Sequence, residues 1–377
     1  DPMPTRSEGG HFALGRVLRS PRVDYLTHLL RYADRMAGEP AGFMTPESSL
    51  LLHGKVPFVQ ADIRTHRLAA DSPDAQYGRL RNLQDGIAVI RRDFSNALVN
   101  GVGYEFGYYG NGWIAADRRL MQVVGRCREI EAEVQASDTR RLDTENSIAV
   151  IVDDIVTYFS AQCSPLHNIS MKYQMPEFYK TGCGMDTYLL EDLELMPEYR
   201  CYVFLNAYRI TPEQENWINA HLKRGGKVLA FVYAAGCVGE IGINPERVQD
   251  ITGIETEVRE KQCPARITYV ENTAKEGKYL PVGGSFGSGV HLGPVFIPQA
   301  GQVLAKQEGE DTPAVVVKDF GDHTVCYSSI PGLSAELLRG LAECAGIPII
   351  NASWTDATYV GDNLFAVHTG AGGKRVF

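Results

Sequence analysis

The stretch SIAVIV, residues Ser147–Val152, is the clearest indicator of the fold. After its first serine the run is continuously apolar, which is typical of a β-strand that is buried on both faces of a parallel sheet. Two further runs of this kind follow, CYVFL at residues 201–205 and KVLAFVY at residues 227–233. We therefore expect a parallel α/β sheet that begins at residue 147.

A helix is predicted between the second and the third of these strands. Thr211 is a suitable N-cap, Pro212 stands in the first turn and Gln214 lies close behind. Gly225 and Gly226 end the helical pattern. A strand, a helix and a strand at this spacing form the unit of a doubly wound sheet.

The first 140 residues also alternate between strand and helix patterns. Apolar runs at residues 56–63 and 102–108 predict strands, and a short one is expected at residues 23–26. Apolar residues at three- and four-residue spacing predict helices over residues 77–100 and 117–135. This βαβα order predicts a second parallel sheet.

Composition excludes several classes of protein. A chain of 377 residues with 44% hydrophobic content is too long for one ordinary domain, so we expect two or three units. The net charge is −9 and the basic residues are scattered, which argues against a nucleic-acid surface. The longest apolar runs fall short of the roughly 20 residues of a membrane-spanning helix, so no membrane partner is expected.

The eight cysteines contain no C-x-x-C pair that would indicate zinc or a redox dithiol. We interpret them as mostly buried thiols in a reducing compartment, which favours a cytoplasmic location. The even count would also permit disulfides if the protein were exported, although a chain of this length does not require them. No metal and no cofactor are expected.

The polar segment ASDTRRLDTEN at residues 136–146 is interpreted as a linker. Residues 245–321 are rich in Gly and Pro and predict an elaborated insertion with short β-like runs. A helix at residues 335–345 and short strands at 358–360 and 364–368 follow. The chain starts and stops without a closing signal, so we expect both ends to be internal to a longer protein.

Several stretches resemble one family of carbohydrate-active enzymes. GKVPFVQADIRTH at residues 54–66 and AVIRRDFSNALVNGVGYEFGYYGNGW at 88–113 resemble the end of the catalytic barrel in β-galactosidases of glycoside hydrolase family 42. AVIVDD at 149–154, VFLNAYRITPEQ at 203–214 and GGKVLAFVYAAG at 225–236 resemble the trimerisation domain of these enzymes, a flavodoxin-like relative of glutamine amidotransferases.

The resemblance implies an α/β chain of three parts. Residues 1–140 would be the C-terminal part of a (β/α)8 barrel, and residues 147–349 a flavodoxin-like trimerisation domain that carries the Gly/Pro-rich insertion. Residues 350–377 would open a small β-domain. The implied substrate is a terminal β-linked galactoside, and the implied assembly is a homo-oligomer, namely a trimer.

The resemblance also implies a retaining mechanism, in which one carboxyl group is the acid/base and a second is the nucleophile, about 5 Å away. The acid/base glutamate of the family lies on an earlier strand, which would precede Asp1. The nucleophile of relatives that read E-A-D-x-R-T aligns with Gln60 of QADIRT. An amide has no anionic oxygen that could attack an anomeric carbon, so we expect no covalent catalysis by this chain alone.

The site of a barrel enzyme lies at the carboxyl ends of its strands. Asp62, Arg64 and Asn111 are therefore candidates for hydrogen bonds to sugar hydroxyls, and Tyr108 and Trp113 for stacking on a sugar ring. The alternatives stay open: Asp62 and Arg64 equally fit a structural ion pair, and Trp113 fits simple packing.

Glu105 is the one carboxylate of the predicted strand 102–108, and it is kept as a replacement catalytic group. A residue at the rim of the site is the favoured interpretation, because a catalytic carboxylate must also lie at the right distance from its partner.

Two further motifs have ordinary interpretations. GGSFG at residues 283–287 fits G-x-S-x-G, but the following residues do not predict the helix that a nucleophile elbow needs, so we expect a flexible loop. Cys237 follows a predicted strand, and His221 and His291 are available as bases. A lone cysteine after a strand is usually inert packing, so a Cys-dependent amidase is the weakest hypothesis.

Two functions therefore remain for the whole chain. The first is a β-galactosidase-like glycoside hydrolase, which the collinear resemblance favours. The second is a non-catalytic carbohydrate-binding or oligomerisation protein derived from that scaffold, which Gln60 favours.

Overall fold

The structure is a computed structural model. It describes residues 13–107, 112–136, 144–159, 161, 164–239, 242–361 and 363–375.

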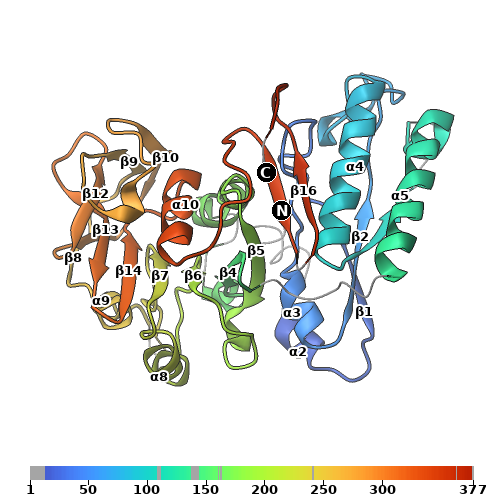
Figure 1. Cartoon of the computed structure of the whole chain (residues 1–377). Helices are drawn as coiled ribbons and strands as arrows, with labels where there is room; N and C mark the ends of the chain where they lie inside the picture. Colours follow the sequence, from blue (N-terminus) through green and yellow to red (C-terminus); the bar gives the residue numbers. More distant parts are fainter. Residues whose placement is uncertain are drawn as a thin grey trace.

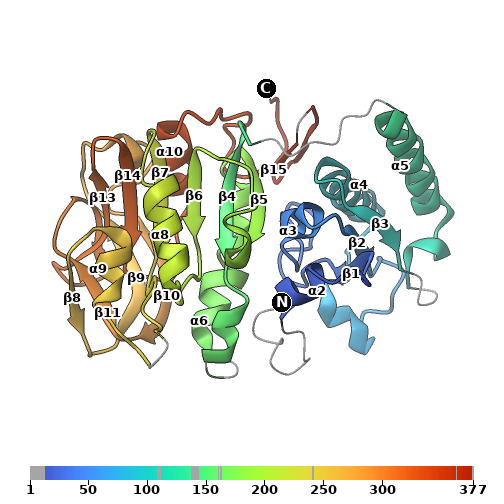
Figure 2. The same cartoon turned by 90° about the horizontal axis from the view of Figure 1, so that it is seen from below.

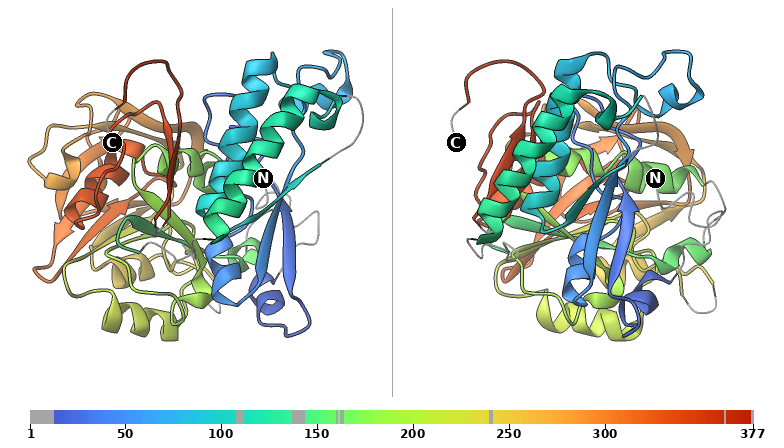
Figure 3. Two further views of the ribbon diagram at one scale, coloured as in Figure 1. Left: turned by 45° about the vertical axis from the view of Figure 1, so that its right-hand side comes forward. Right: turned by 90° about the vertical axis from the view of Figure 1, so that its right-hand side faces the viewer.

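The N-terminal part contains a three-stranded parallel sheet of order β1-β2-β3. Its strands are β1 (Tyr25–Leu29), β2 (Val56–Ala61) and β3 (Gly103–Phe106). Its helices are α2 (Leu14–Leu18), α3 (Glu47–Leu52), α4 (Leu83–Val99) and α5 (Arg118–Ala136). Helices α4 and α5 lie side by side (Figures 1 and 3) and pack on the face of the sheet that carries the buried Val59 and Ala61.

Helix α4 begins later than residue 77, where its apolar periodicity starts. Asn82 is the N-cap, and its Oδ1 accepts from the Asp85 N–H at 3.0 Å. Residues Pro73–Tyr77 form a 3-10 turn that ends at Gly78, whose φ of 94° suits glycine. A side-chain cap and a left-handed residue therefore set the boundary, although the apolar stripe extends beyond it.

A nine-stranded mixed sheet dominates the rest of the chain, in the order β10-β9-β12-β13-β14-β7-β6-β4-β5. Five neighbouring strands are parallel: β14 (His323–Ser328), β7 (Lys227–Val232), β6 (Cys201–Phe204), β4 (Ser147–Val152) and β5 (Gly184–Leu189). Four strands continue the sheet antiparallel: β9 (Cys263–Tyr269), β10 (Ser285–Leu292), β12 (Gln302–Gln307) and β13 (Pro313–Asp319).

Helices cover both faces of this sheet. Figures 1 and 2 show α8 (Pro212–His221) and α10 (Ala335–Cys344) on opposite faces. The predicted cap of α8 is present as a capping box, because Thr211 Oγ1 accepts from Gln214 N–H at 3.2 Å and Gln214 Oε1 accepts from Thr211 N–H at 2.9 Å. The shorter helices are α6 (Pro165–His167), α7 (Met175–Tyr179) and α9 (Arg247–Thr252).

The segment 245–321 is more regular than its composition predicts. Besides α9 it contains β8 (Thr256–Arg259) and β11 (Val295–Pro298), which pair with each other, and the four antiparallel strands of the large sheet. The expected loop at GGSFG is wrong for most of its length, since Ser285 begins strand β10. Strand β10 is at the edge of the large sheet, and exposed and half-buried residues alternate only in its first part. Its glycines conceal this pattern in the sequence.

Strand β5 joins the two sheets. Its edge is covered by α3, where Ser48 Oγ accepts from Thr187 N–H at 3.2 Å and Ser49 Oγ accepts from Leu189 N–H at 2.8 Å. The hairpin of β15 (Ala357–Val360) and β16 (Phe365–His368) packs against both β5 and α4 (Figures 1 and 3). Three parts of the chain that are distant in sequence therefore meet at β5.

Candidate functional site

The carboxyl ends of β1, β2 and β3 lie at one edge of the three-stranded sheet, because the strands are parallel. A cluster of polar side chains follows β1 and β2 at this edge. The carboxylate of Asp62 accepts hydrogen bonds from Tyr32 Oη at 2.9 Å, from Arg35 Nη2 at 2.7 Å and from Arg64 Nη1 at 2.6 Å. Asp62 and both arginines are buried, so these ion pairs act where water screens them little.

Aromatic rings surround the Arg64 guanidinium. Its Cζ lies 5.5 Å from the ring centre of Tyr32, 5.2 Å from that of Tyr77 and 5.0 Å from that of Trp113. These distances are typical of cation–π contacts. Trp113 is 6% exposed, so its ring is a wall of this cluster. The Nε of Arg64 is buried and has no acceptor among the described residues.

The loop that supplies Tyr32 and Arg35 follows β1 and is held by a buried arginine of α4. Arg92 donates from Nη1 to the carbonyl oxygens of Met36 and Glu39, at 2.6 and 2.9 Å, and from Nη2 to that of Arg35 at 3.0 Å. These hydrogen bonds stabilise the loop conformation in which Arg35 reaches Asp62.

Sequence reasoning named Asp62 and Arg64 but missed Tyr32, Arg35 and Tyr77. These three residues have no motif of their own. The available signal was the density of Arg and Tyr in the segment RYADR at residues 31–35, which the sequence alone does not connect with Asp62.

Gln60 and Glu105 lie beside each other. They are register partners on β2 and β3, so their side chains point to the same face of the sheet, opposite to α4 and α5. Gln60 is half-buried and Glu105 is exposed. Asp62, two residues along from Gln60, points instead into the ion-pair cluster. Tyr108 and Asn111 lie outside the described residues.

Burial and the Asp62 carboxylate both raise the pKa of Tyr32. Its phenol therefore stays protonated at neutral pH and remains the donor of the hydrogen bond to Asp62.

Cys237 lies in surroundings that do not activate a thiol. It is buried, and burial raises its pKa to about 11, so the nucleophilic thiolate is scarce at neutral pH. The seven cysteines in the described part of the chain are all free and six of them are buried, as the sequence predicted for most of them.

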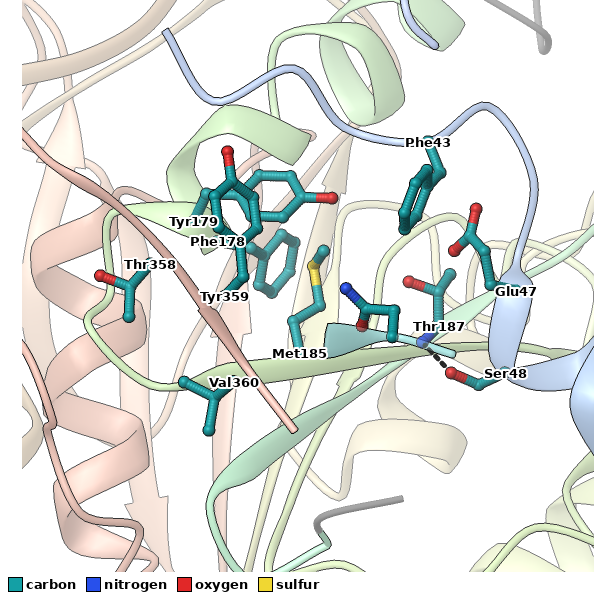
Figure 4. Close-up of a pocket in the computed structure, with 11 residues that line it drawn as sticks. Phe43, Glu47, Ser48, Phe178, Tyr179, Met185, Thr187, Thr358, Tyr359 and Val360 are labelled. Atoms are coloured by element: carbon teal, nitrogen blue, oxygen red, sulfur yellow. Dashed lines mark hydrogen bonds between the residues drawn. The ribbon is translucent and has the colours of Figure 1, made fainter. Parts of the chain in front are cut away.

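A small cavity of about 20 Å³ lies where α3, β5 and β15 meet (Figure 4). Glu47 and Ser48 of α3 lie on one side of it and Tyr359 of β15 on the other. Glu47 Oε1 is buried and lies 3.9 Å from His28 Nε2, and neither atom has a hydrogen-bond partner among the described residues. This volume is sufficient for one water molecule and too small for a sugar.

Within the residues that the structure describes, no group of three or more His, Cys, Asp or Glu side chains is placed to hold a metal ion. No helix in this part of the chain is long and apolar enough to cross a membrane.

Comparison with known proteins identifies a fold but no family. No protein-family model matches the sequence, and no curated protein matches it. Solved structures of β-galactosidases do match. The enzyme from Bacillus circulans sp. alkalophilus is 16% identical with a TM-score of 0.54, and the match covers 90% of this chain and 56% of that one.

Two further β-galactosidases match in the same way. The enzyme from the Antarctic haloarchaeon Halorubrum lacusprofundi is 13% identical with a TM-score of 0.55, over 89% of this chain and 56% of that one. The enzyme from Rahnella sp. R3 is 15% identical with a TM-score of 0.52, over 82% and 49%. This chain thus spans about half the length of these enzymes, and its α/β fold with a mixed sheet is similar to that part of them.

Proposed function

We propose that this chain is the C-terminal part of a β-galactosidase-like glycoside hydrolase whose own substrate class is terminal β-linked galactosides. Residues 1–140 are then the closing part of a (β/α)8 barrel, and residues 147–349 a flavodoxin-like oligomerisation domain. Residues 350–377 are the start of a β-domain. Two features of the fold support this division.

The first is the three-stranded sheet, which has the parallel strands and the outer helices of a barrel segment. The second is the order β14-β7-β6-β4-β5 within the large sheet. Numbered along the chain, these five parallel strands have the order 5-4-3-1-2, which is that of flavodoxin-like folds.

The observation that carries the proposal is the position of Gln60 at the carboxyl end of β2, beside Glu105 on β3. The catalytic groups of a barrel enzyme project from the carboxyl ends of its strands, and the nucleophile of a retaining glycosidase is a carboxylate. With an amide at position 60, the proposed nucleophile position has no carboxylate. We therefore propose that the protein retains the architecture of a hydrolase and does not hydrolyse glycosides through Gln60.

Asp62 and Arg64 are proposed to shape the sugar site rather than to react. The Asp62 carboxylate already has three donors, and it fixes Tyr32 and Arg35 at the strand ends. Tyr77, which is 43% exposed, remains for contact with a ligand.

A second function is favoured by the same glutamine. A chain that retains the buried Asp62 cluster but has an amide at position 60 is suited to bind a galactoside without cleaving it. It is then a carbohydrate-binding or assembly protein. Trimerisation belongs to both proposals.

The test is hydrolysis of a chromogenic β-galactoside by the protein expressed from its full open reading frame. We expect no turnover for the wild type and measurable turnover for Gln60→Glu, with Gln60→Asn as the control without a carboxylate. Turnover by the wild type would overturn the assignment of Gln60 to the nucleophile position. Galactoside binding without turnover in both the wild type and Gln60→Glu would favour the second function.

A further inference from the structure

A groove of about 380 Å³ lies at the carboxyl end of β14, between edge strand β10 and the segment that joins α6 to α7. It is separate from the Asp62 cluster, which belongs to the three-stranded sheet. Ligands of open α/β sheets bind beyond the carboxyl ends of the parallel strands, most often where the strand order reverses, which in this sheet is between β6 and β4. The groove lies beyond the carboxyl end of another parallel strand, and its volume is within the usual range for small-molecule sites. Its position and size therefore suit a ligand.

The floor of the groove is held in place by buried hydrogen bonds. Gln174 Oε1 accepts from Leu333 N–H at 2.6 Å, and its Nε2 donates to Leu333 O at 2.9 Å. Ser328 Oγ donates to Ile330 O at 2.9 Å, which fixes the turn that follows β14. Both side chains are buried, so a ligand would meet a surface that is already ordered and would pay little conformational entropy on binding.

Two aromatic rings line the groove. Tyr173 is 60% exposed, although its ring is large and apolar. Phe286 is half-buried, and a Cβ on Gly332 would come within 3.3 Å of its Cε1, so the glycine leaves space for this ring. Flat apolar rings at a polar surface suit a ligand that has an apolar face and a polar edge, as a pyranose ring does.

The polar side chains of the groove include serine hydroxyls and Arg266, which is paired with a carboxylate. The pairing of β10 with β9 is irregular between Gly287 and His291, and such bulges are frequent next to binding sites. Ser288 lies in this irregular part, where its Oγ accepts from Val290 N–H at 3.2 Å and keeps its own proton to donate. Arg266 forms an ion pair with Glu308 at 3.2 Å. The lining therefore offers hydroxyls and a paired cation, and the Lys172 ammonium lies 5.9 Å from the centre of the Tyr173 ring.

We propose that this groove is a second carbohydrate-binding site, which takes a neutral pyranose stacked on Tyr173 and hydrogen-bonded by Ser288. Neutral ligands are preferred because the one cation of the lining has its own carboxylate partner. The site is independent of the barrel and of the function proposed for Gln60.

The test is binding of methyl β-D-galactopyranoside and methyl β-D-glucopyranoside to the whole chain, measured by saturation-transfer NMR and calorimetric titration. The wild type should bind at least one of them. Tyr173→Ala should weaken binding about fivefold or more, whereas Tyr173→Phe, which keeps the ring, should change it by less than about twofold. Tyr25→Ala is the matched control, because Tyr25 is 62% exposed on β1 and should not affect binding at the groove.

Weaker binding in Tyr173→Ala but not in Tyr25→Ala assigns the binding to the groove, so failure of the proposed barrel function does not affect the result. The proposal is overturned if the wild type binds neither glycoside, or if Tyr173→Ala binds as well as the wild type. Because Tyr173 is exposed, its replacement should preserve the fold, and a circular dichroism melting curve checks this. Loss of binding in Ser288→Ala as well would support the predicted hydrogen bond.

Discussion

Gln60 of β2 and Glu105 of β3 are register partners at the carboxyl edge of the three-stranded sheet. Neighbouring strands are about 4.8 Å apart, so two side chains at paired positions on one face are close enough to interact. The sequence placed each residue on its own strand, but it did not show that they are adjacent. This adjacency leads to a prediction that does not depend on catalytic activity.

In Gln60→Glu, two carboxylates would lie side by side. Like charges at this distance disfavour double ionisation, so the pair should titrate in two steps, one of them raised above the ordinary range of glutamate. Carbon-detected NMR of labelled glutamate side chains measures this. Gln60→Asn is the control, and an ordinary titration of both glutamates in Gln60→Glu would show that the two side chains point apart.

Asp62→Asn should strongly destabilise the protein. The change leaves Arg35 and Arg64 buried without their shared carboxylate, and breaking a buried ion pair by removing one partner costs about 3–5 kcal/mol. Urea denaturation measures the free energy of unfolding. The matched control is Glu129→Gln, because Glu129 pairs with Arg126 where both side chains are exposed, and such pairs contribute about 1 kcal/mol or less. Equal effects of the two substitutions would contradict the importance of the cluster.

His28 should make the protein less stable in mild acid. Burial lowers its pKa from 6.5 to about 4, so the unfolded chain binds a proton that the folded chain does not bind between these values. Its contribution to stability is present above pH 6.5 and is lost as the pH falls toward 4, by about 3 kcal/mol in total.

Replacing His28 with Gln should reduce this dependence, which melting temperatures between pH 7 and pH 4 would show. His221→Gln is the control, since His221 is exposed and should leave the pH profile as in the wild type. Burial raises the pKa of Glu47, so this residue makes the protein more stable as the pH falls, which is opposite to the effect of His28. The variant Glu47→Gln removes that contribution. An unchanged profile in His28→Gln would refute the prediction.

Asp153→Asn should stabilise the protein at alkaline pH. Burial raises the pKa of Asp153 from 3.8 to about 7, and its Oδ2 has no partner among the described residues. The neutral carboxyl of Asp153 therefore contributes fully to folding stability below pH 3.8, and this contribution is lost as the pH rises through 7. Asparagine keeps an oxygen for the Ile155 N–H, which Asp153 Oδ1 now accepts at 2.9 Å, and it carries no charge.

We expect a gain on the order of 2 kcal/mol at pH 8 and almost none at pH 4, measured by urea denaturation. Asp71→Asn, at an exposed position, should have no effect at either pH. A loss of stability at pH 8 in Asp153→Asn would mean that the ionised carboxylate is well solvated or paired.

Local signals predicted the elements whose boundaries depend on neighbouring residues. The cap of α8 was read from Thr211 and Gln214, and both of its hydrogen bonds join residues three positions apart. Strand β4 was read from its apolar run, and all six of its residues are buried. Short-range hydrogen bonds and continuous apolar runs can therefore be recognised directly in the sequence.

Strand β5 was missed because its sequence, GMDTYL, does not alternate and contains buried polar residues. The buried carboxylate of Asp186 is stabilised because Tyr199 Oη donates a hydrogen bond to it at 3.0 Å. The Thr187 N–H donates to Ser48 Oγ, and Ser48 lies 139 residues earlier in the chain. Partners at this separation leave no periodic signal.

The sequence by itself determined the α/β class, the strands that are buried on both faces and the positions of Gln60, Asp62 and Arg64 near strand ends. Only the tertiary structure decided that Asp62 binds Tyr32 and Arg35 as well as Arg64, and that Gln60 faces Glu105. Periodicity and caps depend on residues a few positions apart. Ion pairs and sheet register depend instead on which distant segments the core brings together.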